Sequence, residues 1–277
     1  MVVFGTSGVS NLMKEQKLSY EQIADKMQNM GLMCFEYPFT YGTNISEEKC
    51  IEIGKIFASH NILLSVHAPY YINLASPNEE QIMKSFGYIY ESMRKAKLMG
   101  ADRVVVHPGC LTQQNREDAF CNVYNNLKEF VQRIEGDSEV EGVFICPETM
   151  GKHGQIGSVE EIYSLCEISK RIIPTLDFGH INSFGGGFIK SEDDYCKLLD
   201  KFTAIKNDIH IHFSRIQYGA KGELKHLTFK TDIQNFGPDQ TQFARSLKRY
   251  NQNIRVISES NGDQDEEAKI MLDIFKN

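Results

Sequence analysis

Histidine and carboxylate residues follow a series of short apolar segments along this 277-residue chain. Six such segments lead to residue types that bind metals: His67, His107, Glu148, Asp177, His212 and Glu259. His180 lies three residues beyond Asp177. Imidazole and carboxylate groups without a thiolate suit zinc, manganese or iron. If the segments are neighbouring strands, these side chains meet at one end of the sheet, so the pattern predicts one convergent metal site.

Each of these residues, taken alone, has a more ordinary explanation. A histidine after an apolar strand, such as His67 or His107, is often a core residue with satisfied hydrogen bonds. A lone glutamate, such as Glu148, often forms a salt bridge or caps a helix. The repetition at six strand ends favours the functional interpretation. His210, two residues before His212, is expected to share its face of the strand and to act as a supporting partner.

The number of candidate ligands indicates how many metal ions the site would hold. Seven or more such groups exceed the needs of one ion, and a carboxylate such as Glu148 can bridge two ions. The sequence therefore predicts a cluster of two or three metals. Close-set metals suit the hydrolysis of phosphate esters, because they bind the phosphoryl oxygens, lower the pKa of water and stabilise the leaving oxygen.

Strand and helix patterns alternate along the segments that would position these groups. Strands are predicted at residues 2–6, 32–37, 62–66, 103–106, 142–146, a run ending at 177, 209–213 and 254–258. Eight such alternations predict an α/β fold, a single (β/α)8 TIM-barrel domain over residues 1–277, with its metal site at the C-terminal ends of the strands. A doubly wound open sheet is the structural alternative. Two loops are expected, a glycine-rich cover at 182–188 and a long irregular stretch at 214–238.

Composition limits the other classes of function. A hydrophobic content of 41% is enough for a full core, and the absence of long apolar runs predicts no membrane span. The first residues do not have the pattern of a secretion signal. The seven cysteines are scattered and never spaced as CxxC, which favours free thiols and a cytoplasmic location. A net charge of −7 gives no broad attraction to nucleic acid or anionic lipid, although a local groove made positive by metals is compatible with it.

Short motifs in sequence order, covering almost the whole chain, carry a family resemblance. They are His67-Ala-Pro-Tyr70-Tyr71-Ile-Asn73-Leu74, Val-His107-Pro108-Gly109, Pro-Glu148-Thr149, Leu-Asp177-Phe-Gly-His180, His212-Phe-Ser and Ser-Glu259-Ser. With these motifs the sequence resembles the endonuclease IV family of apurinic/apyrimidinic endonucleases, within the xylose-isomerase-like TIM barrels. The segment that begins at His67 is the most specific.

The resemblance implies a centre of two or three Zn²⁺ ions, with Mn²⁺ or Fe²⁺ as alternatives. The implied ligands of the first metal are His67, His107 and Glu148, and those of the second are Glu148, Asp177, His212 and Glu259. His180 is implied for the third, where Glu223 and His226 would complete the site. Here the chain departs from the family, which has Asp-x-His in place of Glu223-x-x-His226.

The implied activity is that of a hydrolase in base excision DNA repair. Such an endodeoxyribonuclease cleaves the backbone 5′ to an abasic site, with a metal-bridging hydroxide as nucleophile, and leaves a 3′ hydroxyl. Glu148 and Glu259 are the expected catalytic residues. The implied partner is damaged double-stranded DNA, with no membrane, and a monomer is favoured.

DNA contacts are also expected from particular side chains. Tyr70 and Tyr71 align with family residues that enter the duplex at a flipped-out nucleotide. Phosphate contacts are expected from the basic residues Lys152, Arg215, Lys221 and Lys225. Residues 38–42 lack the arginine that helps the family displace the abasic site, and Phe39 or Tyr41 is the candidate wedge in its place.

Two other functions compete with this interpretation. A mononuclear sugar isomerase or epimerase would use one divalent metal, held by Glu148, Asp177, His212 and Glu259. Such a site has no need of His67 and His107, so these histidines favour the nuclease. The third hypothesis is a barrel that binds damaged nucleic acid or a metabolite without turnover.

Overall fold

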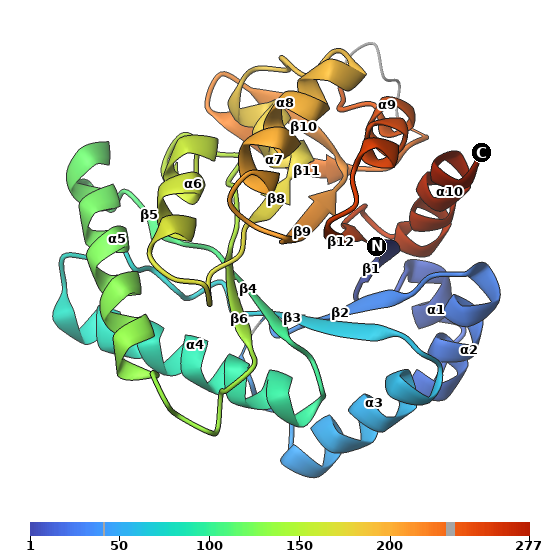
Figure 1. Ribbon diagram of the computed structural model, residues 1–277, viewed down its shortest axis with the longest axis horizontal. Coiled ribbons are helices and arrows are strands. Elements are labelled where there is room, and N and C mark those ends of the chain that lie inside the picture. Colours follow the sequence, from blue (N-terminus) through green and yellow to red (C-terminus); the bar gives the residue numbers. More distant parts are fainter. Residues whose placement is uncertain (41, 231–235) are drawn as a thin grey trace.

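The computed structural model, drawn in Figure 1, describes residues 1–40, 42–230 and 236–277. Within them, eight strands form one parallel sheet in the order β6-β4-β3-β2-β1-β12-β9-β8. The strands are β1 (Val2–Ser7), β2 (Cys34–Pro38), β3 (Leu63–His67), β4 (Arg103–Val106), β6 (Phe144–Pro147), β8 (Thr175–Asp177), β9 (Asp208–Phe213) and β12 (Asn253–Ser258). Parallel bridges from Ile145 to Ile172 and from Glu148 to Thr175 link the two edge strands. The predicted TIM barrel is confirmed.

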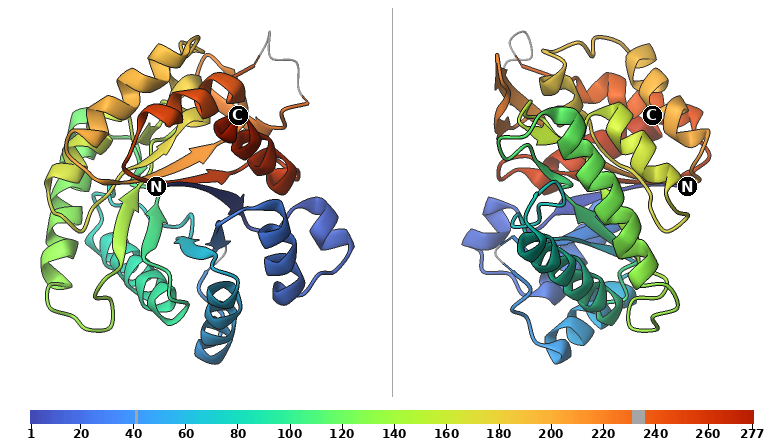
Figure 2. Two further views of the ribbon diagram at one scale, coloured as in Figure 1. Left: turned by 45° about the vertical axis from the view of Figure 1, so that its right-hand side comes forward. Right: turned by 90° about the vertical axis from the view of Figure 1, so that its left-hand side faces the viewer.

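Helices surround the strands on the outside, as both views in Figure 2 show. They are α1 (Asn11–Glu15), α2 (Tyr20–Met30), α3 (Glu47–Ser59), α4 (Glu79–Leu98), α5 (Arg116–Arg133), α6 (Val159–Glu167), α7 (Phe178–Phe184), α8 (Glu192–Thr203), α9 (Gln240–Ser246) and α10 (Gln264–Lys276), with a 3-10 turn at Leu247–Arg249. Side-chain capping fixes the residue at which several helices begin. Ser19 and Ser158 each begin a capping box, in which side chain and backbone satisfy each other's free groups.

The alternation of side chains along each strand divides the barrel into two environments. Residues that face outward, such as Phe35 and Phe213, belong to the large apolar core under the helices. Phe35 stacks on Phe57 of α3 with ring centroids 4.7 Å apart. The residues in between, such as Glu36 and His212, are buried and polar. Packing against helices therefore holds the strands, while the other face carries buried polar groups beside two small apolar clusters, Val3–Cys34–Ile257 and Val105–Cys146–Ile173.

Two stretches differ from the sequence prediction. Residues 182–184, expected in a loop, are the end of α7, because the Asp177 side chain caps that helix by accepting a hydrogen bond from the His180 backbone N–H. The stretch 214–238 is not irregular throughout: it contains an antiparallel hairpin of β10 (Arg215–Gly219) and β11 (Gly222–Leu227). A further short pair joins β5 (Gly109–Cys110) to β7 (Gln155–Ile156).

Among the described residues, no helix has the length and apolar character needed to cross a membrane.

Two helical glycines allow a matched test of the packing. A Cβ added at Gly54 in α3 would lie 2.4 Å from the Met99 carbonyl oxygen, whereas one added at Gly87 in α4 meets nothing within 4 Å. We expect Gly54→Ala to lower the free energy of unfolding by about 1–3 kcal/mol through overpacking. Gly87→Ala should raise it by about 0.5–1 kcal/mol, because alanine has less backbone freedom to lose. Urea denaturation measures both, and equal effects of the two substitutions would contradict this packing.

Candidate metal centre

The Glu148 carboxylate lies at the middle of a ring of imidazoles. His107 Nε2 is 2.9 Å and His67 Nε2 is 3.5 Å from Glu148 Oε2. On the other oxygen, Oε1, His212 Nδ1 is 2.9 Å away and His180 Nδ1 is 3.5 Å away. Glu148 has no solvent exposure. It follows the end of β6 directly, so the barrel places it beside groups from β3, β9 and the loop after β4.

Three groups of possible ligand atoms lie around this carboxylate, and two of them share it. Within each group, the ligand atoms lie within 4.8 Å of one another, and the groups are His67–His107–Glu148, Glu148–Asp177–His212–Glu259 and His180–Glu223–His226. The structure thus brings every sequence-predicted metal ligand into this assembly, with Glu148 shared between two groups. Whether these groups bind ions stays a prediction.

Local structure fixes which nitrogen of each ring faces the centre. His67 Nδ1 lies 2.8 Å from the Ala68 carbonyl oxygen, which directs Nε2 towards Glu148. His180 Nδ1 lies 3.0 Å from the Thr149 carbonyl oxygen, and its Nε2 lies 3.4 Å from Glu223. A backbone carbonyl bonded to one ring nitrogen selects the tautomer whose other nitrogen is free to bind. These two rings are therefore oriented by the backbone.

The β10–β11 hairpin supplies the third group. Glu223 donates its backbone N–H to the Gly151 carbonyl oxygen at 2.9 Å, which docks the hairpin over the loop after β6. The hairpin backbone lies very close to this loop, since a Cβ added at Gly222 would lie 2.1 Å from the Gly151 carbonyl oxygen. Gly222 also has a φ of +91°, a conformation that suits glycine. Consequently Glu223 reaches His180, and His226 Nε2 lies 3.8 Å from Glu223 Oε1.

The chemistry of the donor atoms fits divalent cations. Asp177 Oδ2 is buried and makes no hydrogen bond to any residue that the structure describes, and Glu148 Oε2 has only the imidazoles of His107 and His67 beside it. A buried carboxylate oxygen without a donor is costly, and a bound cation would remove that cost. Nitrogen and oxygen ligands without thiolate suit zinc, manganese or iron. The residues therefore fit a metal centre.

Charges within the cluster are strongly coupled. Burial alone would raise the pKa of Glu148, but the imidazoles of His212, His107 and His180 hold it well below its ordinary value. Burial would likewise raise the pKa of Glu259, yet the neighbouring His212 lowers it to about 2. Burial raises the pKa of Asp177, and the carboxylates of Glu148 and Glu259 add to that effect. Without metal, protons on the imidazoles supply the positive charge that balances these carboxylates.

A cavity of about 660 Å³ opens onto the cluster. Its lining includes His67, His107, Glu223, His226 and Glu259, together with Tyr70, Lys152, Lys225 and Lys14. Tyr70 is 56% exposed, and its ring centroid lies 5.1 Å from that of His107. An aromatic side chain thus stands at the rim, directly above the candidate ligands. Tyr71 is exposed as well, but it packs on Tyr88 and does not line the cavity.

Two residues expected at a DNA interface lie elsewhere. Arg215 is only 4% exposed and donates hydrogen bonds to the Phe229 carbonyl oxygen and to Gln240, so its position argues against a phosphate contact. Phe39 is 2% exposed and packs on Tyr37 in the apolar core, so it is not a surface wedge. The other candidate, Tyr41, lies outside the described residues. Lys221 is exposed but does not line the cavity.

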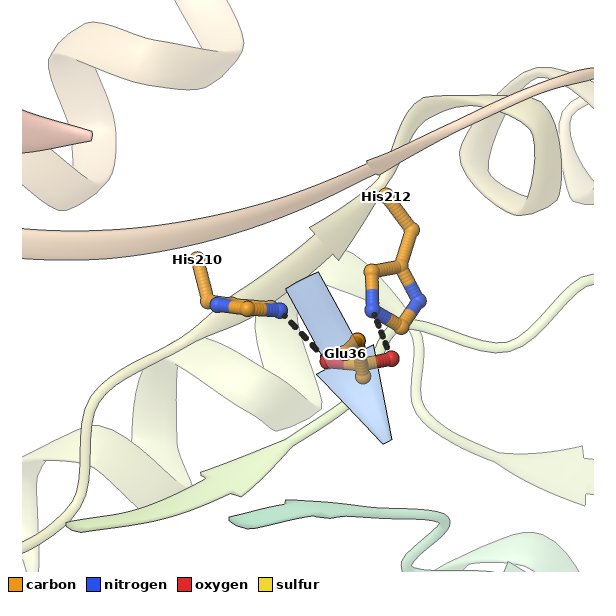
Figure 3. A group of neighbouring side chains, drawn as sticks. All are labelled: Glu36, His210 and His212. Atoms are coloured by element: carbon orange, nitrogen blue, oxygen red, sulfur yellow. Dashed lines mark hydrogen bonds and ion pairs between the residues drawn. The ribbon is translucent and has the colours of Figure 1, made fainter. Parts of the chain in front are cut away.

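Sequence reasoning missed Glu36, which lies in the middle of β2. Its carboxylate stands between His210 and His212, as Figure 3 shows. The signal was available but weak: a single acidic residue within an otherwise apolar run is hard to distinguish from an exposed strand position. Lys14, which lies on α1 and lines the cavity, was also missed.

Comparison with known proteins identifies the family. The family model described as xylose isomerase-like TIM barrel matches residues 24–276, and the chain belongs to that family. An uncharacterized protein of Methanocaldococcus jannaschii is 29% identical over 266 residues, which cover 94% of this chain and 92% of the relative. The resemblance to the endonuclease IV group is confirmed as well: a protein of Malacoplasma penetrans named probable endonuclease 4 is 29% identical over 182 residues, 61% of either chain.

Solved structures share the fold over nearly the whole chain. Endonuclease IV from Thermus thermophilus has 18% identity and a TM-score of 0.65, with 99% of this chain and 97% of that chain covered. A D-tagatose 3-epimerase-like protein has 22% identity and a TM-score of 0.70, with 98% and 97% covered. At these identities the likeness concerns the fold alone, so the choice of substrate rests on the site.

The raised histidine pKa values predict how metal affinity depends on pH. Burial alone would lower the pKa of His67, but the adjacent Glu148 raises it to about 9, and Asp177 and Glu148 act likewise on His180 to give about 10. These imidazoles hold protons at neutral pH and must release them when a metal binds. We therefore expect Zn²⁺ affinity to rise between about pH 6 and about pH 8, with proton release. Calorimetry in buffers of different ionisation enthalpy measures both, and a pH-independent affinity would contradict this charge balance.

Proposed function

We propose that the protein is a metal-dependent phosphodiesterase that cleaves DNA on the 5′ side of abasic sites and leaves a 3′ hydroxyl. One observation carries the proposal: His67 and His107 approach one oxygen of Glu148, while His212 approaches the other. A single-metal sugar site would need only the group on the Asp177 side. The relatives named probable endonuclease 4 support the same choice of substrate.

The residues that would hold the metals form the groups already described. The first metal would have His67, His107 and Glu148, the second Glu148, Asp177, His212 and Glu259, and the third His180, Glu223 and His226. Zn²⁺ is the proposed ion, and the same donors fit Mn²⁺ or Fe²⁺. Bound divalent ions would supply Lewis-acid stabilisation of the phosphoryl oxygens and would lower the pKa of water.

The chain's own residues would orient the DNA and handle protons. Glu259 is the proposed catalytic carboxylate on the cavity side, since its side chain is 16% exposed and lines the cavity, and its low pKa keeps it ionised. Glu148, with a 1% exposed side chain, would hold the two metal groups in register. Tyr70 at the rim would enter the duplex beside the lesion. Lys152 and Lys225 would contact phosphates, which positions the backbone without reading sequence.

The first test is incision of a duplex oligonucleotide that carries one abasic-site analogue. Wild-type protein with metal bound should cut only on the 5′ side of the lesion. His107→Ala and Glu148→Ala should each lose about 100-fold or more in rate, because metal-based charge stabilisation contributes several kcal/mol to such reactions. His60→Ala and Glu52→Ala are matched controls, since both residues lie on or next to α3, away from the cavity. These two variants should cut the DNA at the wild-type rate.

Metal content measured on the same protein separates the alternatives. Two or three ions per chain without incision would contradict the abasic substrate and leave another phosphoester as the target. One ion per chain with turnover of a ketose would instead establish the sugar isomerase or epimerase. That second function has a structural basis, because Glu148, Asp177, His212 and Glu259 form a complete four-residue group by themselves.

A further inference from the structure

Glu36 is a carboxylate sealed inside the barrel. Its side chain has no exposure, and neither do those of His210 and His212 on the neighbouring inner wall. Figure 3 shows the carboxylate of β2 pointing between the two rings of β9. His210 Nε2 lies 2.9 Å from Glu36 Oε2, and His212 Nε2 lies 3.0 Å from Glu36 Oε1. Glu36 does not line the cavity, so it has no access to substrate.

His212 connects this carboxylate to the candidate metal centre. Its Nδ1 lies 2.9 Å from Glu148 and 3.4 Å from Glu259, whereas its Nε2 faces Glu36. A neutral imidazole carries one proton, so a ring that binds metal through Nδ1 must carry that proton on Nε2. Neither His212 Nε2 nor Glu36 Oε1 makes a well-aligned hydrogen bond within the described chain, and the two atoms lie 3.0 Å apart as an ion pair. The two atoms therefore have each other as the natural donor and acceptor.

We propose that Glu36 is a positioning residue, which fixes the ring orientation and tautomer of His212 so that Nδ1 is presented to the metal. A carboxylate on the far nitrogen of a metal-binding histidine has this effect in many metal sites. The inference rests on the metal centre of the proposed function and is independent of its DNA substrate. It adds to the centre a residue that neither touches the metal nor lines the cavity.

Glu36 is itself held in place from the other side. Oε2 receives the Ser65 hydroxyl at 2.9 Å as well as His210 Nε2 at 2.9 Å. Two donors therefore anchor one oxygen and leave the other for His212. The same geometry argues against a separate ion between Glu36 and the two rings. The atoms already lie at direct hydrogen-bond distances, and Ser65 and His210 already donate to Glu36 Oε2.

This arrangement predicts the effect of Glu36→Gln. Because two donors face Oε2, the amide oxygen should take that side, and the amide NH₂ should then face His212 Nε2. A donor at that place favours the tautomer with its proton on Nδ1, which opposes metal binding there. We expect the Zn²⁺ affinity to fall about 10- to 100-fold, the range found when such supporting partners are lost.

The matched control is Glu161→Gln. Glu161 is also a buried glutamate with several hydrogen bonds, to Arg116 and to the backbone at residues 157 and 158, but it belongs to α6 and lies outside the ligand groups. Its substitution should leave Zn²⁺ affinity unchanged. Affinity is measured by competition with a chromogenic chelator, on proteins shown by circular dichroism to be folded.

A second measurement reads the tautomer directly and needs no variant at Glu36. Long-range ¹H–¹⁵N correlation spectra of the zinc-loaded wild-type protein, with the His212 signals assigned by their loss in His212→Ala, should show a protonated Nε2 and a metal-bound Nδ1. Metal on Nε2 would overturn the proposal even if Glu36→Gln fails to fold. So would an unchanged affinity in a folded Glu36→Gln protein, or the loss of a whole additional ion from it.

The result also separates this proposal from the choice of substrate. A Glu36→Gln protein with weakened zinc binding supports the positioning role even if the wild-type protein does not cut abasic DNA, and only the substrate then changes. A wild-type protein that binds no zinc would overturn the metal centre and the positioning role together.

Discussion

The whole site depends on the electrostatics of one buried carboxylate. Glu148 has no contact with solvent, and imidazoles from β3, β9, α7 and the loop after β4 surround it. A buried charge of this kind is stable only when opposite charge compensates it closely. In the metal-free protein, protonated His67, His180 and His212 do so, and their raised pKa values are the consequence, whereas burial lowers the pKa of His107. A metal centre would replace those protons with divalent ions without moving the ligands far.

The barrel can contain many buried polar groups because the two faces of its strands have different roles. Outward-facing strand residues pack beneath the helices and supply the apolar burial that stabilises the fold. Inward-facing residues form polar layers along the barrel axis. Near the N-terminal ends of the strands, Arg103 and Arg255 bind Asp208, Asp102 and backbone carbonyls. Glu36 and His210 follow, and His212 then leads to the open end, so the ligands stand on a rigid, hydrogen-bonded foundation.

Sequence reasoning could predict the fold and the strand-end residues, because both depend on local patterns. Apolar runs ending at His67 or Asp177 indicate a strand and the group at its C-terminal end, and a parallel barrel brings such ends together. The prediction worked less well where long-range packing decides. Glu36 lies within a strand and owes its importance to β9, which is distant in sequence. Nor did the residues around Arg215 indicate that its side chain is buried and donates hydrogen bonds to the Phe229 carbonyl oxygen and to Gln240.

The hairpin after β9 explains why the third group could be foreseen only in part. Glu223 and His226 were expected in an irregular loop, where no geometry can be inferred from spacing. In the structure both lie on β11, and the hairpin is docked on Gly151, so Glu223 faces His180. The change from Asp-x-His to Glu-x-x-His is therefore compatible with three converging side chains. The pairing passes from Gln217–Lys225 to Tyr218–Glu223 with a shift in register, so Leu224, between Glu223 and His226, has no partner on the opposite strand.

In the proposed metal centre, adjoining metal groups share Glu148. Anomalous X-ray diffraction at the zinc absorption edge, from crystals of the zinc-loaded protein, tests it most directly. We expect one peak on each side of Glu148, one near His67 and His107 and one near Asp177 and Glu259, with a further peak between His180 and Glu223. A single peak among Glu148, Asp177, His212 and Glu259, with none beside His67 and His107, would contradict it.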